Sequence, residues 1–322
     1  MSDIIEIKNI TKEFKVLNRR EGLKGSIRDL FSRDYKIVRA VDNISMSIKQ
    51  GEIVGYLGPN GAGKTTLMRI ISALNAPTSG TYSLNLTDYK NTKINEVRRK
   101  IGAVVETPSI YLDMTAKQNL LLQYKMHGIK PDGLQDLLNL VGLPNTGKKK
   151  AKNFSLGMRQ RLSIAFSLIS DPELLILDEP INGLDPEGIK DVRELLYKLN
   201  TERGITILIS SHILDELSKL ATHYGFIDGG RMIKEMSAEE LENSCRHSIK
   251  LTVNNTALLS EALDAMKLDY SVKSETEAEI YSQINVTPLA LNEKGCEVIT
   301  MTQNTDNLED YFMELIGGGE NA

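Results

Sequence analysis

The chain has 322 residues, of which 41% are hydrophobic and 25% are charged, with 39 Lys and Arg against 43 Asp and Glu. This length predicts about two domains, and the composition is typical of a folded globular protein and excludes bulk disorder. The net charge of −4 lacks the basic excess of a nucleic-acid-binding protein, so we expect no nucleic-acid partner. No run of about eighteen consecutive apolar residues occurs, and we therefore expect no membrane span in this chain.

The first part of the chain alternates strand-like and helix-like segments. Residues 4–10 and 40–48 alternate apolar and polar side chains, which predicts two half-buried antiparallel strands. The apolar run 53–57 predicts a further strand, and a helical spacing of apolar residues follows over 64–74. These elements predict an α/β domain in which an antiparallel layer precedes the main sheet.

Three nearly continuous apolar runs, at 101–105, 174–177 and 205–209, predict strands that are covered on both faces, as in a parallel sheet. Residues 107–158 lie between the first two runs and have a mostly helical pattern, in which Thr115 begins a capping-box sequence. We therefore predict a mainly parallel sheet with an inserted helical subdomain.

Two segments stand apart from this predicted domain, which covers residues 1–235. Residues 18–39 interrupt the first strand pair, and between Arg19 and Arg39 seven basic residues outnumber three acidic ones. This basic insert is either an exposed elaboration of a hairpin or a contact for anionic lipid headgroups or a membrane subunit. Residues 236–322 predict a small accessory α+β domain. Its predicted elements are a strand at 249–253, a helix at 258–266, a strand at 297–301 and a helix at 308–316.

The segment 58–66, GPNGAGKTT, matches the phosphate-loop pattern G-x-x-x-x-G-K-[ST], and it follows a predicted strand and opens a predicted helix. Glycines allow the backbone to wrap a polyphosphate, and the helix N-terminus adds positive partial charge. We expect Lys64 at the β- and γ-phosphates and Thr65 at a Mg²⁺ ion. The predicted nucleotide-binding residues of this loop are Gly58, Asn60, Gly61, Ala62, Gly63, Lys64, Thr65 and Thr66.

Two carboxylates, Asp178 and Glu179, follow the apolar run 174–177. Ligands of open α/β sheets bind at the carboxyl ends of the strands, and neighbouring residues of a strand point to opposite sides. Asp178 therefore fits a role beside Mg²⁺, and Glu179 fits the general base that activates an attacking water. The alternative is an acidic strand end that caps the next helix.

The phosphate loop and the acidic strand end indicate a nucleotide hydrolase, and three further segments narrow the class. They are 154–162 (FSLGMRQRL), which precedes the acidic strand, and 181–186 (INGLDP) and 210–212 (SSH), which follow it. Over about residues 4–235 the five motifs, in their order along the chain, resemble the nucleotide-binding subunit of ATP-binding-cassette (ABC) transporters. The resemblance implies the P-loop ATPase cassette fold, with a parallel sheet, an antiparallel layer and a helical subdomain.

The resemblance also implies a second ATPase chain, in a homodimer or a heterodimer that sandwiches ATP. Ser155 and the Gly157 N–H of one chain would contact the γ-phosphate held by the other chain. Asp185 would couple the two sites, and His212 would hold the γ-phosphate and Glu179 in geometry. The expected catalytic residues are Glu179, His212 and Lys64.

Two further positions come from the resemblance. Phe14 lies where the family places an aromatic residue that stacks on adenine, and taken alone it fits a core position equally well. Glu106 replaces the family's glutamine, and an ionised carboxylate can ligate Mg²⁺ but cannot donate a hydrogen bond to phosphate. Glu106 and the signature Ser-Leu-Gly-Met resemble the ATPases of bacitracin and lantibiotic exporters. The expected Mg²⁺ ligands are Thr65, Asp178 and Glu106.

We therefore predict an ATP-hydrolysing subunit of an ABC transporter, an exporter of a peptide antibiotic or another amphipathic substrate, at the cytoplasmic face of the cell membrane. Its expected partners are a multi-spanning permease and the second ATPase subunit, with residues 106–114 passing the motion to the permease. The alternative is a soluble ABC ATPase that acts on ribosomes, DNA or cofactor assembly. The ribosome class usually carries two cassettes, whereas this chain has one phosphate loop. The DNA-repair class needs a long coiled coil, which does not fit between residues 66 and 154.

Overall fold

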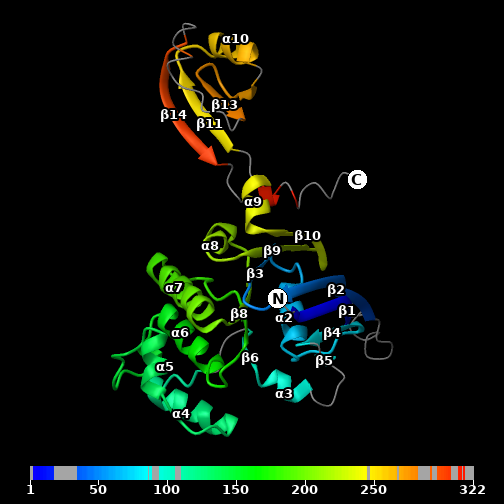
Figure 1. Cartoon of the computed structure of the whole chain (residues 1–322), viewed down its shortest axis with the longest axis vertical. Helices are drawn as coiled ribbons and strands as arrows, with labels where there is room; N and C mark the ends of the chain where they lie inside the picture. Colours follow the sequence, from blue (N-terminus) through cyan, green and yellow to red (C-terminus); the bar gives the residue numbers. More distant parts are fainter. Residues whose placement is uncertain are drawn as a thin grey trace, which may run out of the picture. The chain divides into compact units, whose positions relative to one another are not determined.

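The computed structural model divides the chain into two compact units, residues 1–236 and 237–322, which are described separately (Figure 1). It describes residues 3–17, 35–85, 87–88, 94–105, 110–244, 247–266, 268–281, 291, 296–305, 311–313 and 315. Most of the predicted basic insert, residues 18–34, lies outside the described residues.

An antiparallel sheet in the order β2-β1-β4-β5 forms one layer of the first unit. Its strands are β1 (Asp3–Leu17), β2 (Tyr35–Lys49), β4 (Ser79–Leu84) and β5 (Thr87–Asp88). The alternating apolar residues of β1 and β2, among them Ile5, Ile7 and Ile48, are buried in the core. The predicted antiparallel pair is confirmed, and both strands extend beyond the predicted 4–10 and 40–48.

A second sheet of the first unit, in the order β10-β9-β3-β8-β7-β6, carries the site. Its strands are β3 (Ile53–Leu57), β6 (Ile101–Val104), β7 (Leu174–Asp178), β8 (Thr206–Ser211), β9 (His223–Asp228) and β10 (Arg231–Ser237). Neighbours from β9 to β6 run parallel, as predicted. The prediction of cover on both faces is wrong for 101–105, because the burial of β6 alternates: Gly102 and Val104 are buried, whereas Ile101 is half-buried and Ala103 is exposed. Strand β6 is also the last strand in this order.

Several helices follow strands of this sheet: α2 (Lys64–Ile71), α7 (Pro186–Arg203) and α8 (Leu214–Ser218). Helix α3 (Ile94–Arg98) follows β5 and contacts β4 and β5 of the antiparallel sheet. Helix α2 packs against β7 and β8, so its first turn lies beside the ends of these strands. It is shorter than the predicted 64–74, because Ala73 has a left-handed φ of 61° that ends the helical path.

The predicted helical segment 107–158 contains α4 (Ala116–His127) and α5 (Leu134–Leu140), and α6 (Leu156–Ser167) begins at its end. Helices α4 and α5 contact α6, which packs against α7 (Figure 1). The predicted capping box at the start of α4 is confirmed. The Gln118 N–H donates to Thr115 Oγ1 at 3.2 Å, and the Thr115 N–H donates to Gln118 Oε1 at 2.9 Å. Among the described residues, no helix has both the length and the apolar character needed to span a membrane.

The second unit is an antiparallel sheet in the order β12-β13-β11-β14 with its own core. Its elements are α9 (Ala238–Ser244), β11 (His247–Val253), α10 (Thr256–Met266), β12 (Asp269–Val272), β13 (Glu277–Tyr281) and β14 (Val298–Thr305). The predicted strands at 249–253 and 297–301 and the helix at 258–266 are confirmed. Strands β12 and β13 were not predicted. Both alternate polar and apolar residues, but the runs are only four and five residues long. The predicted helix at 308–316 lies largely outside the described residues.

Candidate active site

The phosphate loop connects the end of β3 to the start of α2. At two of its glycines the surrounding backbone leaves no room for a side chain. A Cβ added at Gly58 would lie 2.1 Å from the Ile227 carbonyl oxygen. A Cβ added at Gly63 would lie 2.3 Å from the Ala40 carbonyl oxygen, and the Gly63 φ of 104° is itself unfavourable for other residues. The loop therefore has its conformation because its backbone is packed tightly between β2 and β9.

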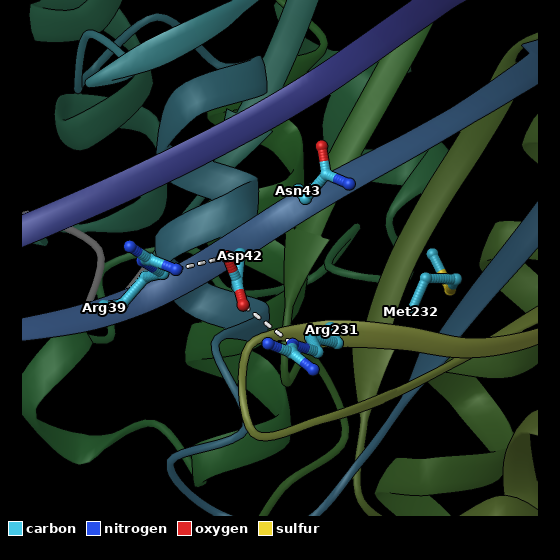
Figure 2. Close-up of a pocket in the computed structure, with 5 residues that line it drawn as sticks. All are labelled: Arg39, Asp42, Asn43, Arg231 and Met232. Atoms are coloured by element: carbon cyan, nitrogen blue, oxygen red, sulfur yellow. Dashed lines mark hydrogen bonds and ion pairs between the residues drawn. The ribbon is translucent and has the colours of Figure 1, made fainter.

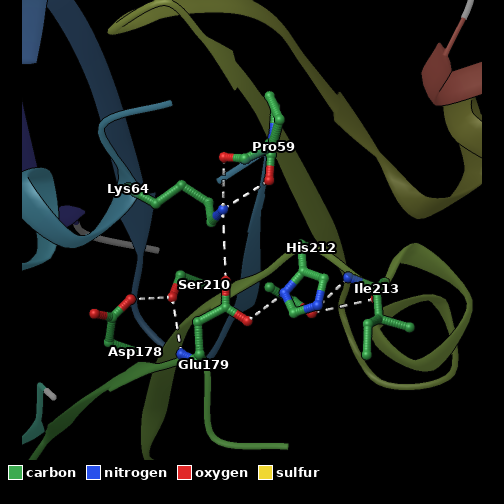
Figure 3. A network of polar contacts seen from close by, with 9 residues as sticks. Pro59, Lys64, Asp178, Glu179, Ser210, His212 and Ile213 are labelled. Carbon is green, nitrogen blue, oxygen red and sulfur yellow. Dashed lines mark hydrogen bonds and ion pairs between the residues drawn. The ribbon is translucent and has the colours of Figure 1, made fainter. Parts of the chain in front are cut away.

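Lys64, the first residue of α2, points its ammonium group into the loop. The side chain is 6% exposed, and Nζ donates to the carbonyl oxygens of Gly58 at 2.6 Å and Pro59 at 3.2 Å (Figure 3). The same Nζ lies 3.5 Å from Glu179 Oε1. A buried cation is thus held by three oxygen acceptors, as a desolvated charge requires.

The two carboxylates at the end of β7 have different partners, and only Asp178 belongs to the strand. Asp178 pairs in register with Ser210 of β8, whose hydroxyl donates to Asp178 Oδ1 at 2.5 Å. Glu179 has a left-handed φ of 50°, and its N–H donates to Ser210 Oγ at 3.0 Å. The buried Ser210 side chain therefore contacts both acidic residues (Figure 3).

Ser210 is a site residue that the sequence interpretation missed. It belongs to the SSH segment that the interpretation quoted, but only His212 of that segment received a role. A serine at the end of a strand is common, so its type alone carries no signal. Its position opposite Asp178 in the strand register is what distinguishes it.

His212 completes the group. Its Nδ1 lies 2.7 Å from Glu179 Oε2, and since an ionised carboxylate only accepts hydrogen bonds, the imidazole donates. One carboxylate oxygen of Glu179 thus faces Lys64 and the other faces His212 (Figure 3). The structure therefore brings together the three residues predicted to be catalytic. Lys64 comes from the start of α2, Glu179 follows the end of β7, and His212 follows the end of β8.

Ser155 and Asp185 lie elsewhere, at the N-termini of α6 and α7. Ser155 Oγ accepts from the Met158 N–H at 3.2 Å, and Asp185 Oδ1 accepts from the Gly188 N–H at 3.1 Å, so both residues are N-caps. A Cβ added at Gly157 would lie 3.5 Å from Gly188 Cα, so the two helix starts are close together. Within the described part of the chain, the side chains of Ser155 and Asp185 hydrogen-bond to backbone amides of their own helices.

Of the two remaining predicted positions, Phe14 and Glu106, the structure describes only Phe14. Phe14 lies on β1, is 37% exposed, and has Lys12 Nζ 5.3 Å from its ring centroid. This exposure leaves its ring accessible and does not fit the alternative of a core residue. Glu106 lies outside the described residues.

The parallel sheet, the phosphate loop at the end of β3 and the acidic end of β7 define a P-loop nucleotide hydrolase. Residues 41–182 match the sequence family described as "ABC transporter". The bacitracin transport ATP-binding protein BcrA of Bacillus licheniformis is 42% identical over 295 residues, which cover 88% of this chain and 95% of that protein. The lantibiotic transport ATP-binding protein SrtF of Streptococcus pyogenes is 44% identical over 203 residues, 63% of this chain and 86% of that protein.

Solved structures agree with these sequence relatives. The cbiO1 protein of Clostridium perfringens, described as part of the ABC transporter complex cbiONQ, superposes with a TM-score of 0.61 and 26% identity over 76% of this chain and 92% of that chain. A dimeric post-hydrolysis structure of the ATP-binding cassette MJ0796 bound to ADP and Pi superposes with a TM-score of 0.59. Its sequence is 26% identical, and the match covers 73% of this chain and 98% of that chain. The chain belongs to the ATP-binding proteins of ABC transporters, a family of ATP hydrolases.

Proposed function

We propose that this chain is the ATP-hydrolysing subunit that energises a membrane exporter of a peptide antibiotic or another amphipathic substrate. The meeting of Lys64, Glu179 and His212 beside the phosphate loop carries the hydrolytic part of the proposal. The transport relatives support the export part, since the similarity to the bacitracin protein spans 88% of this chain and so includes much of the second unit.

The phosphate loop and Lys64 bind the triphosphate. Loop amides and the N-terminus of α2 supply positive potential where the β- and γ-phosphates lie. The Lys64 ammonium group turns from the carbonyl oxygens of Gly58 and Pro59 to the phosphate oxygens, because an anionic acceptor gives a stronger hydrogen bond than a neutral carbonyl. Phe14, exposed on β1, offers its ring to the base.

Glu179 and His212 act on the attacking water. Glu179 accepts a proton from the water as it attacks the γ-phosphate. The His212 imidazole, which donates to Glu179 Oε2 at 2.7 Å, orients this carboxylate and faces the γ-phosphate. Release of the proton and phosphate returns the carboxylate to its ion pair with Lys64, 3.5 Å away.

Thr65 and Asp178 are suited to hold Mg²⁺. Their donor atoms are a hydroxyl and a carboxylate oxygen, which are hard ligands of the kind Mg²⁺ prefers, and α2 packs directly against β7. Ser210 keeps the Asp178 carboxylate oriented through its 2.5 Å hydrogen bond. When bound, Mg²⁺ supplies charge neutralisation of the phosphates. Glu106 is a third proposed ligand.

A second ATPase chain completes each site. Ser155 and the Gly157 N–H, at the N-terminus of α6, present a hydroxyl and amide donors that can bind a γ-phosphate held by the partner. Asp185 caps α7, whose start lies beside Gly157, and so is placed to link the two sites. The similarity to a dimeric cassette bound to ADP and Pi supports this arrangement.

The membrane partner is a multi-spanning permease, which places this chain at the cytoplasmic face of the membrane. The transport relatives support this partner over a soluble ABC ATPase. Residues 106–114 are the proposed contact with the permease, and the basic insert 18–39 is proposed to touch the permease or anionic lipid headgroups.

Purification of the tagged chain from membranes tests the transport proposal. We expect a multi-spanning protein to co-purify, and the pair to hydrolyse ATP and to raise tolerance of a bacitracin-type peptide when produced in a sensitive host. Lys64→Ala should abolish nucleotide binding and tolerance while leaving the permease bound. Recovery of the chain only with ribosomes or DNA would contradict the proposal and favour the soluble alternative.

A further inference from the structure

The turn between β9 and β10 touches the phosphate loop through one glycine. The Gly230 N–H donates to the Ala62 carbonyl oxygen at 3.0 Å, and the Gly230 carbonyl oxygen accepts from the Asp42 N–H at 2.7 Å. Gly230 therefore bridges β2 and the loop by two backbone hydrogen bonds. Ala62, its partner in the loop, is 3% exposed, so this contact is inside the protein.

The same turn is held from outside by a cluster of charges. The Asp42 carboxylate accepts from Arg231 Nε at 2.7 Å and from Arg39 Nη1 at 3.0 Å (Figure 2). Arg39 also pairs with Glu13 of β1 at 3.0 Å, so the cluster ties β1, β2 and the turn together. The hydrogen bond from Arg231 lowers the pKa of Asp42 below its ordinary value.

There is little free space between the turn and the loop. A Cβ added at Gly230 would lie 3.0 Å from the Ala40 carbonyl oxygen, the same atom that limits Gly63. A Cβ added at Gly63 would lie 3.4 Å from Gly230 Cα. A displacement of the turn must therefore move the loop, because both share one packed contact with Ala40.

We propose that Asp42 and Gly230 are positioning residues for the bound nucleotide. Asp42 holds the β9–β10 turn, and the amide of Gly230 fixes the Ala62 carbonyl so that the neighbouring loop amides keep the geometry that binds phosphate. Neither residue touches the nucleotide in this scheme. The inference rests on the proposed function, since it assumes that ATP binds at residues 58–66.

A pair of glycines in the turn provides a matched test. Gly229 and Gly230 both have positive φ, 51° and 81°, but a Cβ at Gly229 meets nothing within 4 Å. Alanine at either position costs backbone strain, whereas only Gly230→Ala crowds the contact with the loop. We expect Gly230→Ala to weaken binding of the magnesium complex of a non-hydrolysable ATP analogue by about tenfold, and Gly229→Ala to leave it unchanged.

A pair of carboxylates provides the second test. Asp42→Asn removes the charge that holds the turn. Glu173→Gln is the control: it removes a more exposed carboxylate that likewise accepts two hydrogen bonds, from Lys100 and Asn85, at the start of β7 and away from the phosphate loop. We expect Asp42→Asn to raise the analogue Kd and the KM for ATP by about threefold, with kcat nearly unchanged. Asp42→Glu should restore part of the affinity, and Glu173→Gln should bind as the wild type.

The outcomes separate this inference from the function on which it rests. If the wild type binds the analogue and Lys64→Ala does not, the nucleotide site is sound. Equal Kd values for Gly229→Ala and Gly230→Ala, or for Asp42→Asn and Glu173→Gln, then overturn the positioning role alone. If Gly230→Ala does not fold, the carboxylate pair decides. A wild type that fails to bind the analogue overturns both proposals.

Discussion

At the scale of single residues, Glu179 shows how backbone and side chain act together. Its left-handed φ of 50° costs on the order of 1 kcal/mol for a residue other than glycine. That conformation lets the chain leave β7 while the carboxylate lies between Lys64 and His212. The strain is offset by hydrogen bonds from the Glu179 N–H to Ser210, so the local geometry depends on the neighbouring strand.

Glu179→Gln tests the proposed general base. We expect kcat for ATP to fall by at least about a hundredfold, because the amide cannot accept a proton from water. The affinity for ATP should be retained, and a stable ATP-bound dimer should accumulate, detectable by size-exclusion chromatography with radiolabelled nucleotide. Hydrolysis at the wild-type rate would remove Glu179 from this role.

Ser210→Ala tests the support of Asp178. The substitution removes the hydroxyl that donates to Asp178 Oδ1, so the carboxylate should be less well oriented for Mg²⁺. We expect the Mg²⁺ concentration for half-maximal ATPase activity to rise by about tenfold, as for other second-layer partners of metal ligands. Ser163→Ala is the control, since Ser163 is equally buried and, among the described residues, its hydroxyl donates to the Arg159 carbonyl oxygen of its own helix and to no acidic side chain. A similar Mg²⁺ shift in both variants would contradict the specific role.

At the scale of elements, several of the proposed nucleotide-binding residues lie at the N-termini of helices. Lys64 begins α2, Ser155 caps α6 and Asp185 caps α7, so each is held by local backbone geometry. The capping box of α4 is the clearest local example, because its two hydrogen bonds join only Thr115 and Gln118. Such caps form from adjacent residues and do not depend on the remainder of the fold.

Thr115→Ala tests the contribution of this cap to stability. The loss of the N-cap hydroxyl should lower the free energy of unfolding of the first unit by about 1 kcal/mol. Thr201→Ala is the control, since Thr201 lies inside α7 and its hydroxyl only donates back to the Tyr197 carbonyl oxygen, a bond that adds little. Urea unfolding followed by circular dichroism measures both. An equal loss in the two variants would show that the box adds nothing beyond a surface hydroxyl.

At the scale of the whole molecule, the two units have separate hydrophobic cores, one built on the sheet that holds β3 and β7 and one on β11 and α10. The candidate site residues all belong to the first unit. Nucleotide binding should therefore stabilise the first unit by mass action.

Hydrogen exchange of the full chain measures this difference. With saturating ATP analogue and Mg²⁺, we expect amide protection to rise in the phosphate loop, at the ends of β7 and β8 and at the start of α6. The strands β11 and β13 should exchange at unchanged rates. A rise in protection of β11 and β13 as large as that of the loop would instead show that the second unit responds to nucleotide.

Sequence alone identified the features that are contiguous along the chain. The phosphate loop at 58–66, the capping box at Thr115 and the burial of β7 and β8 follow from local spacing, side-chain volume and hydrogen-bonding groups within a few residues. The acidic strand end indicated the roles of Asp178 and Glu179, and the resemblance then supplied the role of His212. These assignments were accessible because each depends on short-range rules.

Only the tertiary structure decided which of these features meet. Strand order is a property of the whole sheet, and the order β3-β8-β7 places strands that are far apart in the sequence side by side, so that Lys64, Glu179 and His212 converge. The same long-range pairing exposed β6 at the edge and brought Ser210 to Asp178. It also packed Gly230 against the phosphate loop. Periodicity within a segment cannot specify such contacts, because it records which face is buried and not which strand covers it.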